Sequence, residues 1–161
     1  MALEDLGNLG DFLGGIGVIV TLIYLALQIR SNTQTVRAAS LESVVNSHSQ
    51  FLDRLAADPG LSRIWFSGLW QGMELSEEEG QRLLYLLFSA VRRWESAFHN
   101  VRTGTIEQSS WAGLHKEYTN VFASTGAVGR WPLIRTTLSP AFLPFAEEAI
   151  RKFHAADTMD A

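Results

Sequence analysis

The side chains in this sequence best suited to bind a metal are its four histidines and the glutamates near them. Carboxylate-bridged metal sites in helix bundles use Glu-x-x-His pairs on facing helices. The histidines are His48, His99, His115 and His154, and neither Glu-x-x-His nor His-x-x-x-His occurs. The nearest approach is Glu95 with His99, four positions apart. A single histidine on a helix face is more often a core or boundary residue than a ligand, so we expect no metal and no other cofactor.

Nucleophilic and acid–base catalysis lack their usual motifs as well. The sequence has no Gly-x-Ser-x-Gly elbow and no glycine-rich phosphate loop. Zero cysteines exclude a thiolate nucleophile, a disulfide and a thiolate metal site. Glu147 and Glu148 are adjacent, so on one helix they point about 100° apart and cannot act as a dyad. We therefore predict no catalytic residues and a protein that is not an enzyme.

One charged cluster remains, in the segment Arg92-Arg93-Trp94-Glu95. Two guanidinium groups and a carboxylate beside an indole are one way to build a binding site. The simpler interpretation is an internal ion pair, because arginine and glutamate side chains one turn apart on a helix lie on the same face. We expect this pair to be structural.

Charge and composition limit the partners of the chain. The net charge is -4 and the thirteen lysines and arginines are scattered, so the basic surface that nucleic-acid-binding proteins need is missing. The 161 residues are 47% hydrophobic and 19% charged, which fits one domain with one core. The apolar residues are unevenly distributed, however, and a dense block of them lies near the amino terminus.

That block runs from Phe12 to Ile29 and contains eighteen residues without a charge. At about 1.5 Å per residue such a helix is roughly 27 Å long, close to the thickness of the hydrocarbon layer. Its only strongly polar side chains are Thr21 and Gln28, whereas the core helix of a soluble protein normally has a polar face. A cleaved signal peptide fits poorly, because residues 1–11 are acidic and no small-residue cleavage site ends the block. We predict a transmembrane helix here, in contact with the lipid bilayer.

Charge asymmetry predicts the orientation of this helix. No basic residue precedes the block, while Arg30 and Arg37 follow it directly, so the positive-inside rule places the carboxy-terminal part in the cytoplasm. We expect a single-pass protein of a bacterial inner (plasma) membrane. Residues 1–11 are then outside the cytoplasm, residues 30–156 form a cytosolic helical bundle, and residues 157–161 are a flexible tail.

One side of the predicted transmembrane helix carries small and hydrogen-bonding residues at heptad spacing. Alternating steps of three and four, the a/d spacing of a coiled coil, connect Gly7, Gly10, Gly14, Gly17, Thr21, Tyr24 and Gln28. We call this set the small-residue seam. Helices in lipid associate through close backbone approach and interhelical hydrogen bonds, which small residues favour. A chain with one span has no second helix to receive the seam, so we predict an interface with another copy or with another membrane protein.

Two alternatives to this interface stay open. The first is that the seam is not an interface, because glycine is frequent in membrane helices generally and a row of small residues can be found by choosing where the heptad count starts. The other alternative is a homo-oligomeric channel or sensor with a pore lined by Thr21 and Gln28. The span has no charged ring of the kind that lines many ion pores, so tight packing is the preferred interpretation.

The chain after the block has helical periodicity, and no segment shows the period of two that strands have. The first helix is expected to continue to about residue 57, with a kink at residues 31–33 and a stop at Asp58-Pro59-Gly60. Further helices are expected over residues 61–71, 77–103, 110–123, 130–138 and 140–155, with a loop at residues 124–129. The fold class is therefore all-α: an amino-terminal transmembrane helix that continues into a helical bundle.

Serines and one tryptophan-rich helix give the finer expectations. Ser76 forms a capping box with Glu79, either Ser109 or Ser110 caps the fourth helix, and Ser139 caps the last. The helix over residues 61–71 carries Trp65 and Trp70, which either contact the lipid interface or pack under the bundle. We prefer packing under the bundle, because large aromatic residues dominate small cores.

The amino-terminal region resembles a known family. The stretches Gly10-Asp11-Phe12-Leu13-Gly14 and TLIYLALQIRSNT (residues 21–33) look like the start of a family of small uncharacterised bacterial membrane proteins. Those proteins have a similar amino-terminal span and a helical domain with a segment similar to Arg92-Arg93-Trp94-Glu95. The resemblance implies a bacterial single-pass membrane protein with a helical cytosolic domain, and it implies no activity, cofactor or catalytic residue.

Three functions follow in order of preference. The first is a scaffold or accessory subunit, without catalysis of its own, that forms a homo-oligomer or joins a larger membrane complex through the small-residue seam. The second is the homo-oligomeric channel or sensor. The third is a membrane-anchored enzyme that uses the interior of the bundle.

Overall fold

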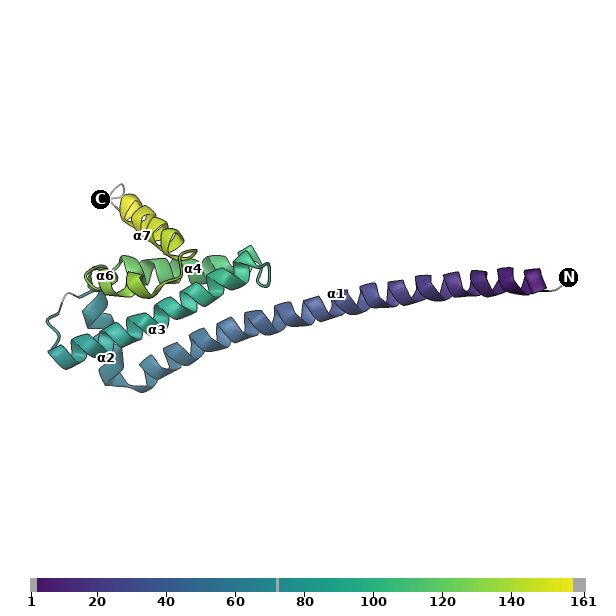
Figure 1. Cartoon of the computed structure of the whole chain (residues 1–161). Coiled ribbons are helices and arrows are strands. Elements are labelled where there is room, and N and C mark those ends of the chain that lie inside the picture. The colour runs from purple at the N-terminus through teal and green to yellow at the C-terminus, as the bar shows by residue number, and fades with distance from the viewer. Residues whose placement is uncertain (1–2, 72, 158–161) are drawn as a thin grey trace. The chain divides into compact units, whose positions relative to one another are not determined.

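The computed structural model describes residues 3–71 and 73–157, and every regular element in these ranges is helical (Figure 1). The elements are α1 (Leu3–Ala57), α2 (Pro59–Leu69), α3 (Glu77–Arg102), α4 (Gln108–Ala123), α5 (Thr125–Val128), α6 (Trp131–Ile134), the 3-10 turn η1 (Arg135–Thr137) and α7 (Leu143–Asp157). The predicted all-α class is confirmed. The predicted tail lies outside the described residues apart from Asp157, which ends α7.

The chain divides into two compact units, residues 1–39 and residues 40–161. In the first unit the described residues all belong to α1, which includes residues 3–11 as well as the apolar block. The helix does not break at residues 31–33. Instead, the Thr33 hydroxyl donates to the Ile29 carbonyl at 2.8 Å and the Thr35 hydroxyl to the Ser31 carbonyl at 3.1 Å, so these side chains add bonds to their own helix.

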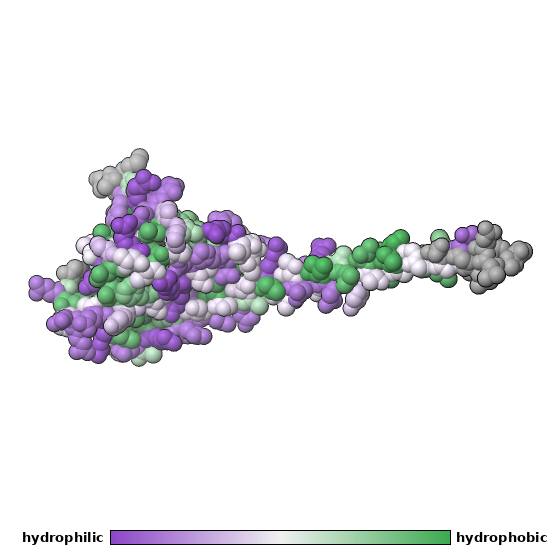
Figure 2. Space-filling view, in the orientation of Figure 1, coloured by the Kyte–Doolittle hydropathy of each residue, from purple (hydrophilic) through white to green (hydrophobic). Residues whose placement is uncertain are grey.

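Every described side chain of the apolar block is exposed, and Figure 2 shows apolar residues gathered along this part of α1. From Phe12 onward α1 is long and apolar enough to cross a membrane, and none of its most apolar stretch is buried in the protein. A core helix of a soluble protein would be mostly covered by its neighbours. The coarse prediction, an apolar amino-terminal helix with the length for a membrane span, agrees with this geometry.

The second unit is a helical bundle formed by residues 40–57 of α1 and the elements from α2 to α7. Within it α3 packs against α2 and α4, and α4 packs against α7. Trp94 of α3 is fully buried at the centre. Its indole stacks on Phe122 of α4, with ring centres 5.5 Å apart, and meets Phe142 edge to face at 5.2 Å. Aromatic rings in these offset and edge-to-face arrangements give the small core much of its buried apolar area.

Local capping chemistry sets several helix ends where the sequence predicts them. The Asp58 carboxylate accepts from the Gly60 and Leu61 amides and starts α2. The predicted capping box is confirmed, because Ser76 and Glu79 bond to each other's backbone amides at the start of α3. Gly104 follows α3 with φ of +71°, a left-handed conformation that glycine adopts without strain.

Three finer predictions are wrong, and a fourth holds only in part. α4 begins at Gln108 after Glu107, which has no side-chain cap bond, so neither Ser109 nor Ser110 is the cap. The carbonyl of Glu107 accepts from Ser110 and Trp111 and begins the helix instead. Part of the predicted loop at residues 124–129 is the short helix α5. The residues before Leu143 form only a turn on the Ser139 carbonyl, so α7 starts later than predicted. The preferred packing of the α2 aromatics under the bundle holds in part: Trp65 packs against the core, whereas Phe66 and Trp70 are 54% and 40% exposed.

Candidate functional site

The small-residue seam lies on α1 within the first unit. Gly10, Gly14, Gly17, Thr21, Tyr24 and Gln28 are all exposed, and Gly7 belongs to α1 but its surroundings lie outside the described side chains. The first unit supplies no second helix that covers the seam in the part of the chain that the structure describes. Within this unit, no other helix contacts the described residues of the seam.

The glycines of the seam are not required by packing within the chain. A Cβ atom added at Gly10, Gly14 or Gly17 would meet no atom within 4 Å. The opposite holds at Gly68 and Gly126 in the bundle, where a Cβ would lie 2.5 Å and 1.8 Å from its nearest neighbour. Glycine in a helix interior costs roughly 1 kcal/mol relative to alanine. Gly68 and Gly126 therefore have a packing reason within the bundle, and Gly10, Gly14 and Gly17 have none among the described residues.

The polar groups of the seam differ in whether their hydrogen-bonding capacity is already used within α1. The Thr21 hydroxyl donates to the Gly17 carbonyl at 2.8 Å, so its proton is already used within α1. The Tyr24 hydroxyl and the Gln28 amide have no hydrogen-bond partner among the described residues. Unpaired polar groups are costly in hydrocarbon, and a facing helix or the headgroup region relieves that cost.

The charged cluster of α3 separates into two structural contacts. Arg92 Nη1 lies 2.5 Å from Glu95 Oε2, which confirms the predicted ion pair. Glu95 is only 6% exposed, and its other oxygen accepts from the Ser139 amide at 2.8 Å. Burial alone would raise the pKa of Glu95, but hydrogen bonds from Ser139 and Arg92 outweigh it and hold that pKa below its usual range. Arg93 is separate: its Nε donates to the Ser47 carbonyl at 2.9 Å.

The paired glutamates of α7 also have separate partners. Glu147 forms an ion pair with Arg135 at 2.9 Å, and Glu148 forms one with Lys152 at 2.7 Å. Their carboxylates therefore point in different directions, as their adjacent positions predict.

The histidines are not brought together. His99 lies 3.2 Å from the Ser139 hydroxyl, His115 accepts from the Trp94 indole at 3.3 Å, and His154 is exposed on α7. Burial lowers the pKa of His115, which favours the neutral ring that accepts this bond. Within the described part of the chain, no three His, Cys, Asp or Glu side chains form a group that suits a metal.

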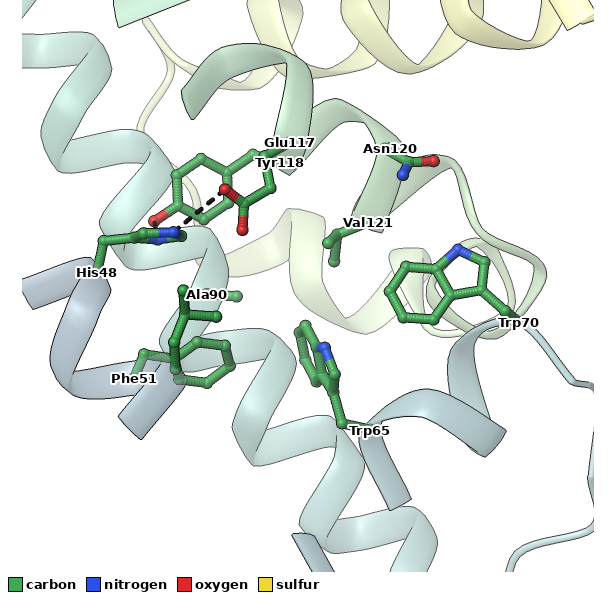
Figure 3. Close-up of a pocket in the computed structure, with 10 residues that line it drawn as sticks. His48, Phe51, Trp65, Trp70, Ala90, Glu117, Tyr118, Asn120 and Val121 are labelled. Atoms are coloured by element: carbon green, nitrogen blue, oxygen red, sulfur yellow. Dashed lines mark hydrogen bonds and ion pairs between the residues drawn. The ribbon is translucent and has the colours of Figure 1, made fainter. Parts of the chain in front are cut away.

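His48 belongs to a site that the sequence only partly indicates. The sequence places His48 at helical spacing with the apolar residues Leu41, Val44 and Phe51, and its ring is mostly buried. Its Nε2 lies 3.1 Å from Glu117 Oε2, and its Nδ1 lies 3.2 Å from the Tyr118 hydroxyl (Figure 3). Burial raises the pKa of Tyr118 well above that of a free phenol, so the hydroxyl keeps its proton.

These three side chains lie at a pocket that sequence reasoning missed. The residues that line it come from residues 40–57 of α1, α2, α3 and α4, and all belong to the second unit. The only sequence signals were the inward position of His48 and the clustering of tryptophans at residues 65–70. The adjacent glutamate and tyrosine at 117 and 118 had no distinguishing spacing.

Comparison with known proteins adds no assignment. No protein-family model matches the chain, and neither a curated protein nor a solved structure matches it. The family resemblance of the amino-terminal region thus remains a sequence-based expectation.

Proposed function

We propose that this protein is a single-pass membrane protein that self-associates through the small-residue seam and acts as a scaffold or accessory subunit, with no reaction of its own. Gly10, Gly14 and Gly17 carry the proposal, because glycine weakens α1 at positions where no described residue needs a missing Cβ. Close approach of a facing membrane helix gives each of them a use.

The facing helix in this proposal is a second copy of α1. A heptad-spaced seam is self-complementary, so two copies related by a two-fold axis present the same small residues to each other. Gln28 and Tyr24 then supply the donors and acceptors that find no partner among the described residues. The cytoplasmic orientation of the helical domain follows from Arg30 and Arg37 and belongs to the same proposal.

The same geometry does not favour a pore. Thr21 donates its proton within its own helix, and glycines at successive a and d positions let helices approach closely, which leaves no lumen. We therefore propose packing and not conduction.

Matched glycine variants test the seam. Gly14→Leu and Gly17→Leu place a large side chain on the seam, whereas Gly15→Leu places the same side chain about 100° away on the helix. All three positions are open and exposed, so the three variants have equal hydropathy and no clash within the chain. We expect the detergent-extracted mass to fall from oligomer to monomer for the first two and to stay unchanged for Gly15→Leu. Equal masses for all three would refute the seam.

Disulfide crosslinking locates the contact independently, since the chain has no native cysteine. Thr21→Cys lies on the seam, and Ile19→Cys lies on the opposite face of the same turn. In membranes, oxidation should link Thr21→Cys into dimers and leave Ile19→Cys monomeric.

Extraction tests the membrane span separately. A protein that alkaline carbonate releases from membranes would contradict the span itself.

A further inference from the structure

The pocket at His48 lies in the second unit and has no role in the proposed function. Its cavity volume is about 130 Å³. Its walls include the rings of Phe51, Trp65, Trp70 and Tyr118, and His48 and Glu117 lie at one end (Figure 3). An engineered apolar cavity of about 150 Å³ holds one benzene molecule, so this volume suits a ligand with a single aromatic ring.

The rings are arranged as walls and not as a stack. Phe51 and Trp65 have ring centres 5.1 Å apart and planes at 80°, and His48 and Tyr118 have centres 5.7 Å apart and planes at 80°. Perpendicular rings form corners that present both faces and edges to the space between them. An aromatic ligand in such a corner makes edge-to-face contacts, the arrangement that aromatic pairs prefer over a face-to-face sandwich.

The pocket also has free hydrogen-bonding capacity. The indole nitrogens of Trp65 and Trp70 have no hydrogen-bond partner among the described residues. Glu117 uses Oε2 toward His48 and is about half exposed, so its other oxygen can accept. The lining residues thus offer unpaired indole N–H groups and a carboxylate oxygen, which match a hydroxyl group that accepts one bond and donates another.

Charges around the pocket disfavour a charged ligand of either sign. The Arg93 guanidinium lies 4.6 Å from the centre of the Phe51 ring and opposes a cation. The Glu117 carboxylate, which lines the pocket, opposes an anion. Burial also keeps the Tyr118 hydroxyl protonated, which indicates that this interior stabilises ions poorly.

We propose that this pocket binds a small neutral aromatic molecule with a hydroxyl group, of the phenol class. The ring packs among Phe51, Trp65 and Trp70, and the hydroxyl donates to Glu117 and accepts from an indole N–H. This inference is independent of the seam, because every residue that lines the pocket belongs to the second unit.

The test follows the five indole N–H resonances of the ¹⁵N-labelled full chain in lipid nanodiscs. Phenol should shift the Trp65 and Trp70 signals saturably, with a dissociation constant on the order of 1 mM for so small a ligand. Trp94 is the internal control, because its indole already donates to His115 and is fully buried. Trp65→Phe and Trp70→Phe identify the two signals.

Three probes of similar size separate the ligand classes. Phenol should bind at least tenfold more tightly than benzoate or tetramethylammonium. Tighter binding of tetramethylammonium would overturn the neutral class in favour of an organic cation. Shifts that rise linearly with phenol and include Trp94 would indicate partition into lipid and would overturn the site.

A substitution that fills the cavity provides a second test of phenol binding. Ala90 is fully buried at the pocket wall, and Ala90→Leu places three more carbons in its space. This variant should weaken phenol binding at least tenfold. Trp70 is partly exposed at the same pocket, so Trp70→Ala is the variant that keeps the test valid if Ala90→Leu does not fold. Unchanged affinity in a folded variant would overturn the proposal.

Discussion

A close approach of two helices at Gly126, and its absence at Gly113, predict opposite effects for two Gly→Ala substitutions. Gly126 of α5 lies against the end of α2, and a Cβ added there would be 1.8 Å from the Gly68 carbonyl oxygen and 3.0 Å from the Leu69 Cα. Gly113 lies in the middle of α4 and is exposed, and a Cβ added there would meet nothing within 4 Å. The substitutions are chemically the same and differ only in their surroundings.

The magnitudes follow from these distances. The atoms that Gly126→Ala would meet are backbone, so the two helices must separate by roughly 1 Å or more to restore van der Waals contact. Overpacking of this kind costs about 1–3 kcal/mol of unfolding free energy. Gly113→Ala has no such cost and gains about 0.5–1 kcal/mol from the higher helix propensity of alanine.

Thermal unfolding of the full chain in detergent, followed by tryptophan fluorescence, measures both effects. For a domain of this size we expect Gly126→Ala to lower Tm by about 5–10 °C and Gly113→Ala to raise it by about 2–4 °C. A Gly126→Ala protein with a Tm at or above that of the wild type would refute the close approach of α2 and α5. That result would also remove the basis for placing Trp70 at the pocket.

Other predictions concern the helix ends and the buried carboxylate. Ser76→Ala removes the capping box and should lower the unfolding free energy by about 1 kcal/mol in urea titrations. The control is Ser62→Ala, at an exposed position of α2, which should change the unfolding free energy by less than about 0.5 kcal/mol. Gly104→Ala should cost about 1 kcal/mol in the same assay, because alanine is strained at positive φ. Glu95→Gln should cost about 1–3 kcal/mol at neutral pH, since it removes the charge from the pair with Arg92. The pKa of Glu95 is lowered in the folded protein. The stability advantage of the wild type over Glu95→Gln is therefore complete above about pH 4.3, and it should shrink as pH falls through the folded pKa. An equal difference in unfolding free energy at neutral pH and near pH 3 would contradict this ion pair.

The features that the sequence predicted correctly are local ones. The stop at Asp58-Pro59-Gly60, the capping box of Ser76 and the end of α3 at Gly104 each depend on groups within about four residues. The Arg92–Glu95 pair is local in the same sense, because helix geometry alone places residues three apart on one face. The apolar block needs only composition and length, and its exposure in the structure agrees with that reading.

The errors arise where two local preferences compete. Ser109 and Ser110 are both good caps, but the helix starts earlier, on the carbonyl of Glu107. Ser139 is also a good cap, but its amide is held by the distant Glu95, and the residues after it form a turn before α7 begins. At Ser139, a tertiary contact with Glu95 thus competes with the local preference for capping.

The sequence alone predicts the all-α class, most helix ends and a helix long and apolar enough to cross a membrane. It can do so because helix propensity, capping and hydropathy depend on residues that are near one another in the chain. Only the tertiary structure joined His48 to Glu117 and Tyr118, 70 positions further along the chain. It alone distinguished Gly126, which touches backbone, from the open glycines of α1. These contacts depend on the angle and register at which helices pack, and a periodic pattern shows which face is apolar but not what that face meets.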